Sequence, residues 1–404
     1  MEYRIDKGSG NKLSVLGFGC MRFPRNLGGI DQRKTGELVA RAVEGGINYF
    51  DTAYIYPGSE EALGLALERE GLRDKVYIAT KIPLMTLRGR DDFDRHLNRS
   101  LERLKTDRID YYLFHMLSDM DTWERLGAWG AEKWVEEKKR QGKIGRIGFS
   151  FHGSRGEFFR LLEAYDWEFC QIQYNYSDEN FQAGKAGLMK AAEKMAVMVM
   201  EPLLGGKLCS LPRRGAALFK KADPRKSAAE WGLNWVWDHR EVTLLLSGMG
   251  DRAQLEENLV LAGKSRPGML GEGERALYRE VNGILNSVYR IRCTGCNYCM
   301  PCPRHINIPS CFSTYNLSYA MGWYHGVKNY ITSIAVMSKQ LGSPRFCAAC
   351  GACESRCPQK LPIIPLLRQV RRRLEPPWIT LTVAVVRAVL GVGGKNAPVP
   401  PANS

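Results

Sequence analysis

NYFD at residues 48–51, VYIATK at 76–81 and DYYLFH at 110–115 are short apolar runs, and each ends in an ionisable side chain. Runs this short are typical of the buried strands of a parallel sheet. Five more lie at residues 14–19, 144–149, 169–174, 196–200 and 242–247. Helical stretches separate them, at residues 34–44, 60–70, 93–104, 156–164 and 183–194. The alternation predicts an α/β fold, a closed (β/α)8 TIM barrel.

A doubly wound open sheet is the alternative fold. No G-x-G-x-x-G follows the first run, so the dinucleotide-binding form of that fold lacks its main signature. Residues 3–13 contain a Gly-Ser-Gly turn, which predicts a hairpin across the bottom of the barrel. We therefore expect a barrel over residues 1–265 and a helical connector over 266–292.

The composition of the 404 residues, 44% hydrophobic and 25% charged, excludes a mainly disordered, collagenous or coiled-coil chain. The first ten residues are polar and predict no signal peptide. The apolar run 378–394 is interrupted by Arg387 and is shorter than the roughly 20 residues of a spanning helix. A docked or interfacial helix is favoured there over a membrane anchor.

Eight of the twelve cysteines lie in two tight runs, Cys293-x2-Cys296-x2-Cys299-x2-Cys302-Pro303 and Cys347-x2-Cys350-x2-Cys353-x3-Cys357-Pro358. In a chain without an export signal, such clusters indicate metal ligands in a reducing compartment, here the cytoplasm, rather than disulfides. Of the four other cysteines, we expect Cys170 and Cys209 to be buried, and Cys20 to lie at the barrel mouth.

Three cysteines spaced by two residues can bind three irons of one cubane, while a fourth, followed by Pro, binds the other cluster. The set predicted for one 4Fe–4S cluster is Cys293, Cys296, Cys299 and Cys357. The set predicted for the second is Cys347, Cys350, Cys353 and Cys302. The first run has two residues instead of three before its last cysteine, so Cys302 is the least supported ligand. Structural zinc, bound by paired Cys-x2-Cys motifs, is the alternative.

These runs predict a mainly helical, ferredoxin-like two-cluster domain over residues 293–370 and a loosely ordered basic and apolar tail over 371–404. Residues 271–404 hold 16 Lys and Arg against 5 Glu and no Asp, a net charge of +11 in a chain whose total is +15. This basic surface is either a solvated face or a dock for an acidic electron carrier such as ferredoxin or flavodoxin. No recognition motif for nucleic acid accompanies it.

Active sites of such barrels lie at the C-terminal ends of the strands. Asp51, Lys81 and His115 end three of the apolar runs, and Tyr56 follows Asp51 by five residues. A phenol has a pKa of about 10, which a neighbouring ammonium lowers. The set suits protonation of a carbonyl oxygen while hydride reaches the carbon. Taken singly, Asp51 could be a helix cap and Lys81 a structural ion-pair partner.

Residues 1–265 resemble an aldo/keto reductase. The matching strings are GFGCM at 17–21, GINYFDTAYIY at 46–56, SEE at 59–61 with Gly64, Lys81, His115, GFS at 148–150, Gln171 and QLEEN at 254–258. With its cysteine region, the whole chain resembles the ferredoxin-fused aldo/keto reductases of anaerobes. The resemblance implies Tyr56 as the general acid, Lys81 and Asp51 as groups that tune it, and His115 as the group that orients the substrate.

The resemblance also implies a nicotinamide nucleotide, NADP(H) or NAD(H). The residues that it assigns to the carboxamide are Ser150 and Gln171, to the pyrophosphate Pro202, Leu203, Gly205 and Lys207, and to the adenosine end Gly248, Arg252, Gln254 and Asn258. Three positions depart from the family pattern. Phe151 stands where Asn is frequent, Met200 where an aromatic stacks on nicotinamide, and the 248–252 loop lacks the Lys-Ser pair that binds a 2′-phosphate.

Nicotinamide moves two electrons together as hydride, whereas iron–sulfur clusters move single electrons. Either a flavin mediates, or the clusters deliver electrons to a substrate radical, or they are structural. The leading hypothesis is an oxidoreductase acting on a small carbonyl or alcohol, with the two clusters linking it to a carrier protein. The alternative is a non-catalytic nucleotide-sensing, redox-sensing or electron-transfer protein that uses the barrel as a scaffold.

Overall fold

The computed structural model of the 404-residue chain describes residues 1–331, 334 and 342–380. The chain divides into two compact units, and each is considered by itself. The first unit comprises residues 1–204 and 226–275, and the second comprises residues 205–225 together with the described residues from 276 onward. The boundary differs from the expected one because residues 205–225 leave the barrel unit.

The first unit is a closed barrel of eight parallel strands, in the order β10-β11-β12-β3-β6-β7-β8-β9. Its strands are β3 (Leu16–Gly19), β6 (Tyr49–Asp51), β7 (Tyr77–Pro83), β8 (Ile109–His115), β9 (Ile144–Ser150), β10 (Phe169–Gln173), β11 (Ala196–Met200) and β12 (Leu244–Ser247). All eight predicted runs contribute a strand, so the (β/α)8 prediction is confirmed. Since all strands are parallel, their carboxyl ends open at one mouth.

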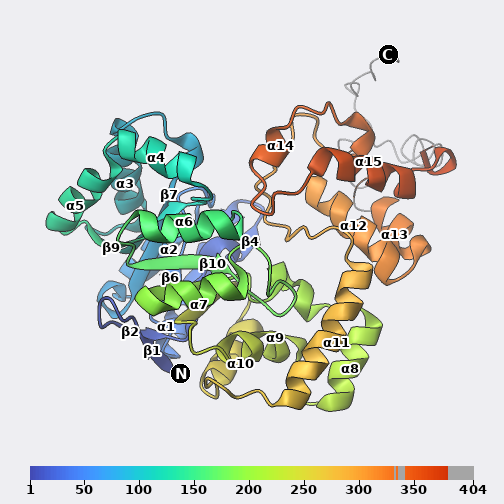
Figure 1. Cartoon of the computed structure of the whole chain (residues 1–404), viewed down its shortest axis with the longest axis horizontal. Coiled ribbons are helices and arrows are strands. Elements are labelled where there is room, and N and C mark those ends of the chain that lie inside the picture. Colours follow the sequence, from blue (N-terminus) through green and yellow to red (C-terminus); the bar gives the residue numbers. More distant parts are fainter. Residues whose placement is uncertain (332–333, 335–341, 381–404) are drawn as a thin grey trace. The chain divides into compact units, whose positions relative to one another are not determined.

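Helices follow the strands and cover the barrel (Figure 1). They are α1 (Gln32–Glu44), α2 (Ser59–Arg69), α3 (Asp91–Leu104), α4 (Met120–Ala128), α5 (Ala131–Arg140), α6 (Arg155–Ala164), α7 (Gly184–Lys194), α9 (Ala228–Trp237) and α10 (Arg252–Ala262). Several begin with a side-chain cap. The Asp31 carboxylate accepts from the Lys34 N–H at 3.0 Å, for example, which satisfies a backbone donor at the start of α1.

A hairpin closes the bottom of the barrel, as predicted. Strands β1 (Tyr3–Ile5) and β2 (Lys12–Ser14) pair antiparallel. Leu13 is fully buried in one core cluster with Tyr49, Tyr111 and other side chains from the barrel strands. Asn11 donates to the Tyr111 hydroxyl at 3.0 Å, and that hydroxyl donates to Asp6 at 2.9 Å. These contacts fix the hairpin on the barrel, so the interior is a packed core rather than a channel.

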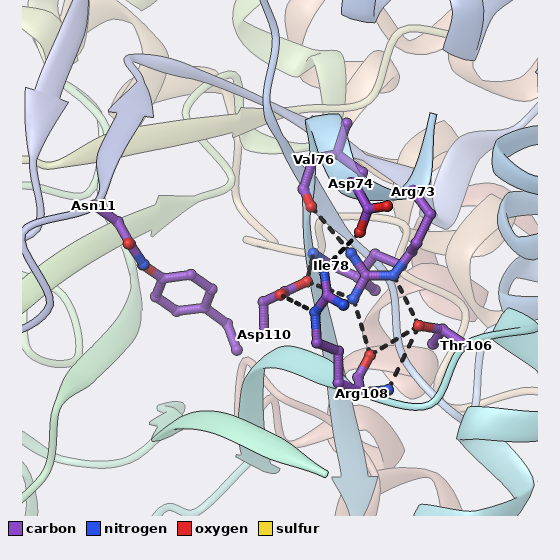
Figure 2. Close-up of polar contacts among 9 residues, drawn as sticks. Asn11, Arg73, Asp74, Val76, Ile78, Thr106, Arg108 and Asp110 are labelled. Carbon is purple, nitrogen blue, oxygen red and sulfur yellow. Dashed lines mark hydrogen bonds and ion pairs between the residues drawn. The ribbon is translucent and has the colours of Figure 1, made fainter. Parts of the chain in front are cut away.

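Charged residues near the starts of β7 and β8 form a polar network (Figure 2). The Arg73 guanidinium donates to Asp110 at 2.9 Å, and Asp110 accepts from the Ile78 N–H at 2.8 Å. Arg108 pairs with Asp74 at 2.9 Å. These charges lie at the amino ends of their strands, opposite the mouth, and their partners are backbone groups and one another. We therefore interpret these charges as groups that stabilise the barrel, whereas the predicted catalytic side chains lie at the carboxyl ends of the strands.

The second unit is mainly helical, as predicted. Its helices are α8 (Arg213–Ala222), α12 (Ile308–Ala320), α13 (Trp323–Tyr330), α14 (Ala352–Ser355) and α15 (Ile363–Leu374), with the last part of α11 (Glu272–Val288). Its core includes Ile306, Phe312, Tyr330 and Leu367. The α8 helix belongs here because Phe219 packs edge-on against Tyr278 of α11, with ring centroids 5.6 Å apart.

The basic run 371–373 was expected to open a loosely ordered tail, and this is wrong. It forms the last turn of α15, because Leu367, Val370 and Leu374 repeat at helical spacing and are fully or almost fully buried. Cations at a helix C-terminus are also favoured by its dipole. Most of the apolar run 378–394 lies outside the described residues. Among helices of the described part, none has the length and hydropathy to cross a bilayer.

Candidate functional site

The four predicted catalytic side chains come from neighbouring strands at the barrel mouth. Asp51 ends β6, Lys81 lies in β7, and His115 ends β8. Tyr56 lies in the loop between β6 and α2, where its N–H donates to the Ala53 carbonyl at 2.9 Å and its own carbonyl accepts from the Ser59 N–H at 3.0 Å. Two successive turns thus bring the phenol back over the strand ends.

Lys81 is the centre of this group. Its ammonium donates to Asp51 Oδ1 at 2.6 Å and to the Thr52 carbonyl at 2.7 Å. The side chains of Lys81 and Asp51 are 1% and 6% exposed. A buried ammonium and carboxylate at this distance stabilise each other's charge, and removing either one leaves the other buried without its counter-ion.

The phenol and the imidazole complete the group. The Lys81 ammonium lies 5.5 Å from the centroid of the half-buried Tyr56 ring. The rings of Tyr56 and His115 meet edge-on, with centroids 6.1 Å apart. The structure therefore brings all four side chains together, with the ammonium over the phenol ring and the imidazole edge-on to it.

The electrostatics of the mouth favour a neutral imidazole at His115 and raise the pKa of the Asp51 carboxyl. Burial holds the pKa of His115 well below its usual range, and the nearby charges of Lys81 and His152 lower it further. Burial raises the pKa of Asp51, while the Lys81 ammonium opposes that rise. A neutral His115 can donate one hydrogen bond to a substrate oxygen without carrying charge.

A second ion pair, between the buried Glu60 and the half-buried Arg103, supports the site, and sequence reasoning missed its role. Glu60 Oε1 accepts from the Thr80 hydroxyl at 2.7 Å, next to Lys81 in β7. Glu60 Oε2 lies 3.2 Å from the Arg103 guanidinium, which also stacks 4.5 Å from the Tyr54 ring. The matched SEE string at 59–61 marked this position without saying what it does. Glu60 thus links β7, through Thr80, to the loop that contains Tyr54 and Tyr56, through Arg103.

Ser150 ends β9 and Gln171 lies in β10, and both are buried. The resemblance assigns the nicotinamide carboxamide to these two residues. Ser150 Oγ accepts from the Met116 N–H at 2.9 Å. Gln171 Nε2 lies 3.6 Å from the Met200 sulfur, while its Oε1 is buried with no hydrogen-bond partner among the described residues. An unpaired buried acceptor is costly, and a carboxamide N–H would satisfy it. The residues fit the group.

The residues expected at the adenosine end gather at the start of α10. Asn258 donates to the Ser247 hydroxyl at 3.1 Å, and Gln254 Oε1 accepts from the Gly250 N–H at 3.0 Å. Gly248 has no side chain, and a Cβ there would lie 3.2 Å from the Arg22 side chain. The Arg252 side chain is 74% exposed and 3.4 Å from Glu256. The helix N-terminus and this arginine form a surface suited to an anion.

The loop expected to bind the pyrophosphate is divided between the two units. Pro202 and Leu203 belong to the barrel unit, whereas Gly205 and Lys207 belong to the second unit. Gly205 has φ 65°, a conformation that glycine adopts without strain. The Lys207 ammonium donates to the carbonyl of Cys293 and lies 5.8 Å from the Tyr289 ring. This contact connects Lys207 to the cysteine region, which the sequence did not predict.

The eight clustered cysteines line two cavities in the second unit. A cavity of ≈370 Å³ is lined by Cys302, Cys347, Cys350 and Cys353, with Cys299 also at its wall. A smaller one is lined by Cys293, Cys296, Cys299 and Cys357. Each cavity is lined by the four cysteines of one predicted ligand set, Cys302 and Cys357 included, and their role as cluster ligands stays a prediction. Left-handed residues within the runs, such as Gly295 at φ 72° and Ala349 at φ 52°, let the short loops wrap around each cavity.

The shape of the cavities bears on the choice of metal centre. Thiols spread around a cavity suit a cubane, which is bulkier than a single ion. Of the other cysteines, Cys20 and Cys170 are buried, but Cys209 is exposed. The expectation for Cys209 is wrong because it ends a short 3₁₀ segment at the surface.

Comparisons with known proteins find relatives of both the barrel and the cysteine region. Residues 15–263 match the aldo/keto reductase family, and residues 292–361 match a 4Fe-4S dicluster domain. The methylglyoxal reductase YeaE of Escherichia coli (strain K12) is 30% identical over 218 residues, covering 52% of this chain and 73% of the relative. The aldo-keto reductase yakc [NADP(+)] of Schizosaccharomyces pombe is 26% identical over 199 residues, covering 46% and 57%.

A solved aldo-keto reductase from Bacillus halodurans, in its holo form, superposes with a TM-score of 0.58 at 25% identity, covering 70% of this chain and 96% of that one. Other curated relatives are also matched over part of their length, for example 46% of an enzyme from Mycolicibacterium smegmatis and 81% of one from Trypanosoma cruzi. The fold and the mouth define a barrel oxidoreductase. The chain belongs to the aldo/keto reductase family, and it carries a 4Fe–4S dicluster domain after the barrel.

Proposed function

We propose that this protein interconverts a small carbonyl compound and its alcohol at the barrel mouth, with a nicotinamide nucleotide as the hydride carrier. The observation that carries the proposal is the buried Lys81–Asp51 pair beneath the Tyr56 ring, next to a neutral His115. A proton donor, the cation that stabilises its conjugate base, and a neutral hydrogen-bond donor are what reduction of a carbonyl needs.

Each of these residues has one task in the proposal. Tyr56 gives its phenolic proton to the carbonyl oxygen as negative charge develops there. Lys81 stabilises the phenolate that remains, and Asp51 keeps the ammonium charged and in place. His115 holds the carbonyl oxygen in line with the phenol. When bound, the nicotinamide supplies hydride to the carbonyl carbon, and Ser150 and Gln171 hold its carboxamide.

NADP(H) is the nucleotide that we favour. The exposed Arg252 at the start of α10 is available for a 2′-phosphate, in place of the absent Lys-Ser pair, and the yakc relative is named for NADP(+). The E. coli relative is named for methylglyoxal, an example of the small carbonyl substrates proposed. Nothing in the relatives named above supports a flavin.

The dicluster domain supports a second redox role for the same chain. We propose that its two clusters exchange single electrons with a carrier protein, in a reducing cytoplasm where clustered thiols persist. The ligand sets proposed are those that line the two cavities, Cys302 with Cys347, Cys350 and Cys353, and Cys357 with Cys293, Cys296 and Cys299.

The test is turnover of anaerobically purified protein with NADPH or NADH and a panel of small aldehydes and ketones, methylglyoxal included. Tyr56→Phe keeps the ring and removes the proton donor, so it should lower kcat by 10²–10⁴-fold. The matched control is Tyr324→Phe, which removes an exposed hydroxyl from α13 in the second unit. Carbonyl turnover that survives Tyr56→Phe would contradict the assignment.

A further inference from the structure

The two cysteine cavities differ in their access to solvent. The larger cavity, lined by Cys302, Cys347, Cys350 and Cys353, has exposed residues at its rim: Cys350 itself, and Ala348 and Ala349 beside it. In the smaller cavity Asn297 is exposed, but Cys293, Cys296 and Cys299 are half-buried and Cys357 is buried. The larger cavity is therefore the one with an exposed thiol, and a cluster there would lie beside small side chains at the surface.

The rim of the larger cavity carries unpaired positive charge. Arg304 and Arg356 line it, and both are exposed. Within the described residues, neither guanidinium makes a hydrogen bond or an ion pair. An exposed arginine without an internal partner is available to a carboxylate from another molecule.

The acidic residues of this region are directed to internal partners. Residues 293–380 contain ten Lys and Arg but only two acidic residues, Glu354 and Glu375. Glu354 accepts from the Ile364 N–H at 2.8 Å at the start of α15. Glu375 accepts from the hydroxyls of Tyr330 and Ser343, and its side chain is 4% exposed. The rim of the larger cavity therefore presents cations with no exposed anion from this segment to compensate them.

We infer that this face, defined by Pro303, Arg304, Ala348, Ala349 and Arg356, binds an acidic one-electron carrier protein, which exchanges electrons with the cluster held by Cys302, Cys347, Cys350 and Cys353. The inference deepens the proposed redox role of the clusters and does not depend on the carbonyl chemistry of the barrel. Charge complementarity of this kind speeds the encounter of electron-transfer partners, and small apolar residues at the centre allow close approach.

Other ligands suit this face less well. Among the described residues that line the cavity there is no Phe, Tyr or Trp, and His305 is a single exposed imidazole rather than a row of rings, so the lining lacks the stacking platforms that bind single-stranded nucleic acid. Its exposed apolar residues are Ala and Pro, whereas a surface that inserts into a bilayer presents large groups such as Trp, Phe and Leu. A compact acidic protein matches a small apolar centre with a cationic rim.

The transfer step is a simple one-electron exchange. The reduced carrier gives one electron to the cluster and is itself oxidised by one electron. No bond forms or breaks and no proton is required. Cys302, Cys347, Cys350 and Cys353 would hold the cluster that accepts this electron, and when bound that cluster would supply the one-electron redox chemistry.

The experiment mixes a chemically reduced acidic ferredoxin with oxidised, cluster-loaded full-length protein in a stopped-flow instrument, without nucleotide or carbonyl. Bleaching of the cluster absorbance gives a second-order rate constant. Arg304→Glu/Arg356→Glu should lower it at low salt by about tenfold or more, since steering contributes 10–10³-fold. The difference should shrink as salt is raised, because screening weakens the attraction.

The matched control is Lys220→Glu/Lys221→Glu, which makes the same change in charge on exposed residues of α8 outside the cavity. It should change the rate by less than about threefold. Iron and sulfide content and the spectrum of the reduced clusters should be unchanged in both variants. Arg304→Ala/Arg356→Ala should give an intermediate rate.

Equal rates for wild type and Arg304→Glu/Arg356→Glu would overturn the inference, and so would equal slowing by the α8 control. Binding of anionic phospholipid vesicles that needs Arg304 and Arg356, with ferredoxin rates unaffected, would show a membrane-facing surface and would also overturn it. Because no carbonyl or nucleotide is present, loss of the barrel's proposed activity would leave this result unchanged. The two proposals can thus fail separately.

Discussion

The barrel mouth and the cysteine cavities hold their chemical groups in different ways. At the mouth, Asp51, Lys81 and His115 project from consecutive strands of a closed sheet, above a core that is complete without them. In the second unit the thiols lie on loops, and the space that they line is a cavity rather than packed side chains. The comparison teaches that the first site is built by the fold, whereas we expect the loops of the second to depend on their cofactor for stability.

Removal of iron should give the largest difference between the two sites. The intact chain should contain about eight irons, because two 4Fe–4S clusters are expected. Chelation should abolish amide-exchange protection around the cysteine loops while the barrel strands keep theirs, since metal binding supplies folding free energy. Exchange measured by mass spectrometry on loaded and stripped protein checks this.

A cysteine substitution tests the same point site by site. Cys350→Ala should lose half of the iron or more, whereas Cys209→Ala, an exposed cysteine outside both cavities, should lose none. Full iron content in Cys350→Ala, or one zinc and no sulfide in the wild type, would refute the cluster assignment.

Lys81→Met sharpens the barrel side of the comparison. It leaves Asp51 buried without its counter-ion, and breaking a buried pair in this way costs about 3–5 kcal/mol. We expect the urea midpoint of the barrel to fall while iron content stays constant. Lys190→Met, which breaks an exposed and solvent-screened pair with Glu193, should leave the midpoint almost unchanged. Equal losses in the two variants would mean that the Lys81 pair is not buried as described.

Glu60→Gln tests whether the contacts of Glu60 with Thr80 and Arg103 affect catalysis. It keeps the shape but weakens the contacts to Thr80 and Arg103, at a cost of about 1–3 kcal/mol. Because Thr80 precedes Lys81, we expect kcat to fall by more than KM rises. A change in KM alone would show that Glu60 acts on binding and not on the position of the ammonium.

The pH dependence of stability gives the smallest effect. The folded-state pKa of His115 is depressed below 6.5 by burial and by Lys81, so its contribution to stability is complete above about pH 6.5 and is lost as the pH falls through the folded-state value. The slope contributed is at most about 1.4 kcal/mol per pH unit. His115→Asn should flatten the acid limb of a urea-midpoint profile, and an unchanged limb would contradict the neutral imidazole.

Much of this could be read from the sequence because the signals were local. Apolar runs of strand length predicted all eight barrel strands, and cysteine spacing predicted which thiols share a cavity. The contributions of Glu60, Arg103 and Lys207 could not be read, because they depend on pairings over 40 residues or more along the chain. The run 371–373 was misjudged because its charge masked the apolar face of α15.

The most direct test of the account places both regions in one experiment. Carbonyl turnover with NADPH and ferredoxin-driven cluster reduction are measured on the same preparations of wild type, Tyr56→Phe and Arg304→Glu/Arg356→Glu. The account predicts that Tyr56→Phe loses turnover by 10²–10⁴-fold and keeps its rate of cluster reduction, while the arginine variant shows the reverse. Loss of both activities in Tyr56→Phe with its iron intact, or of neither, would contradict the division of labour between barrel and clusters.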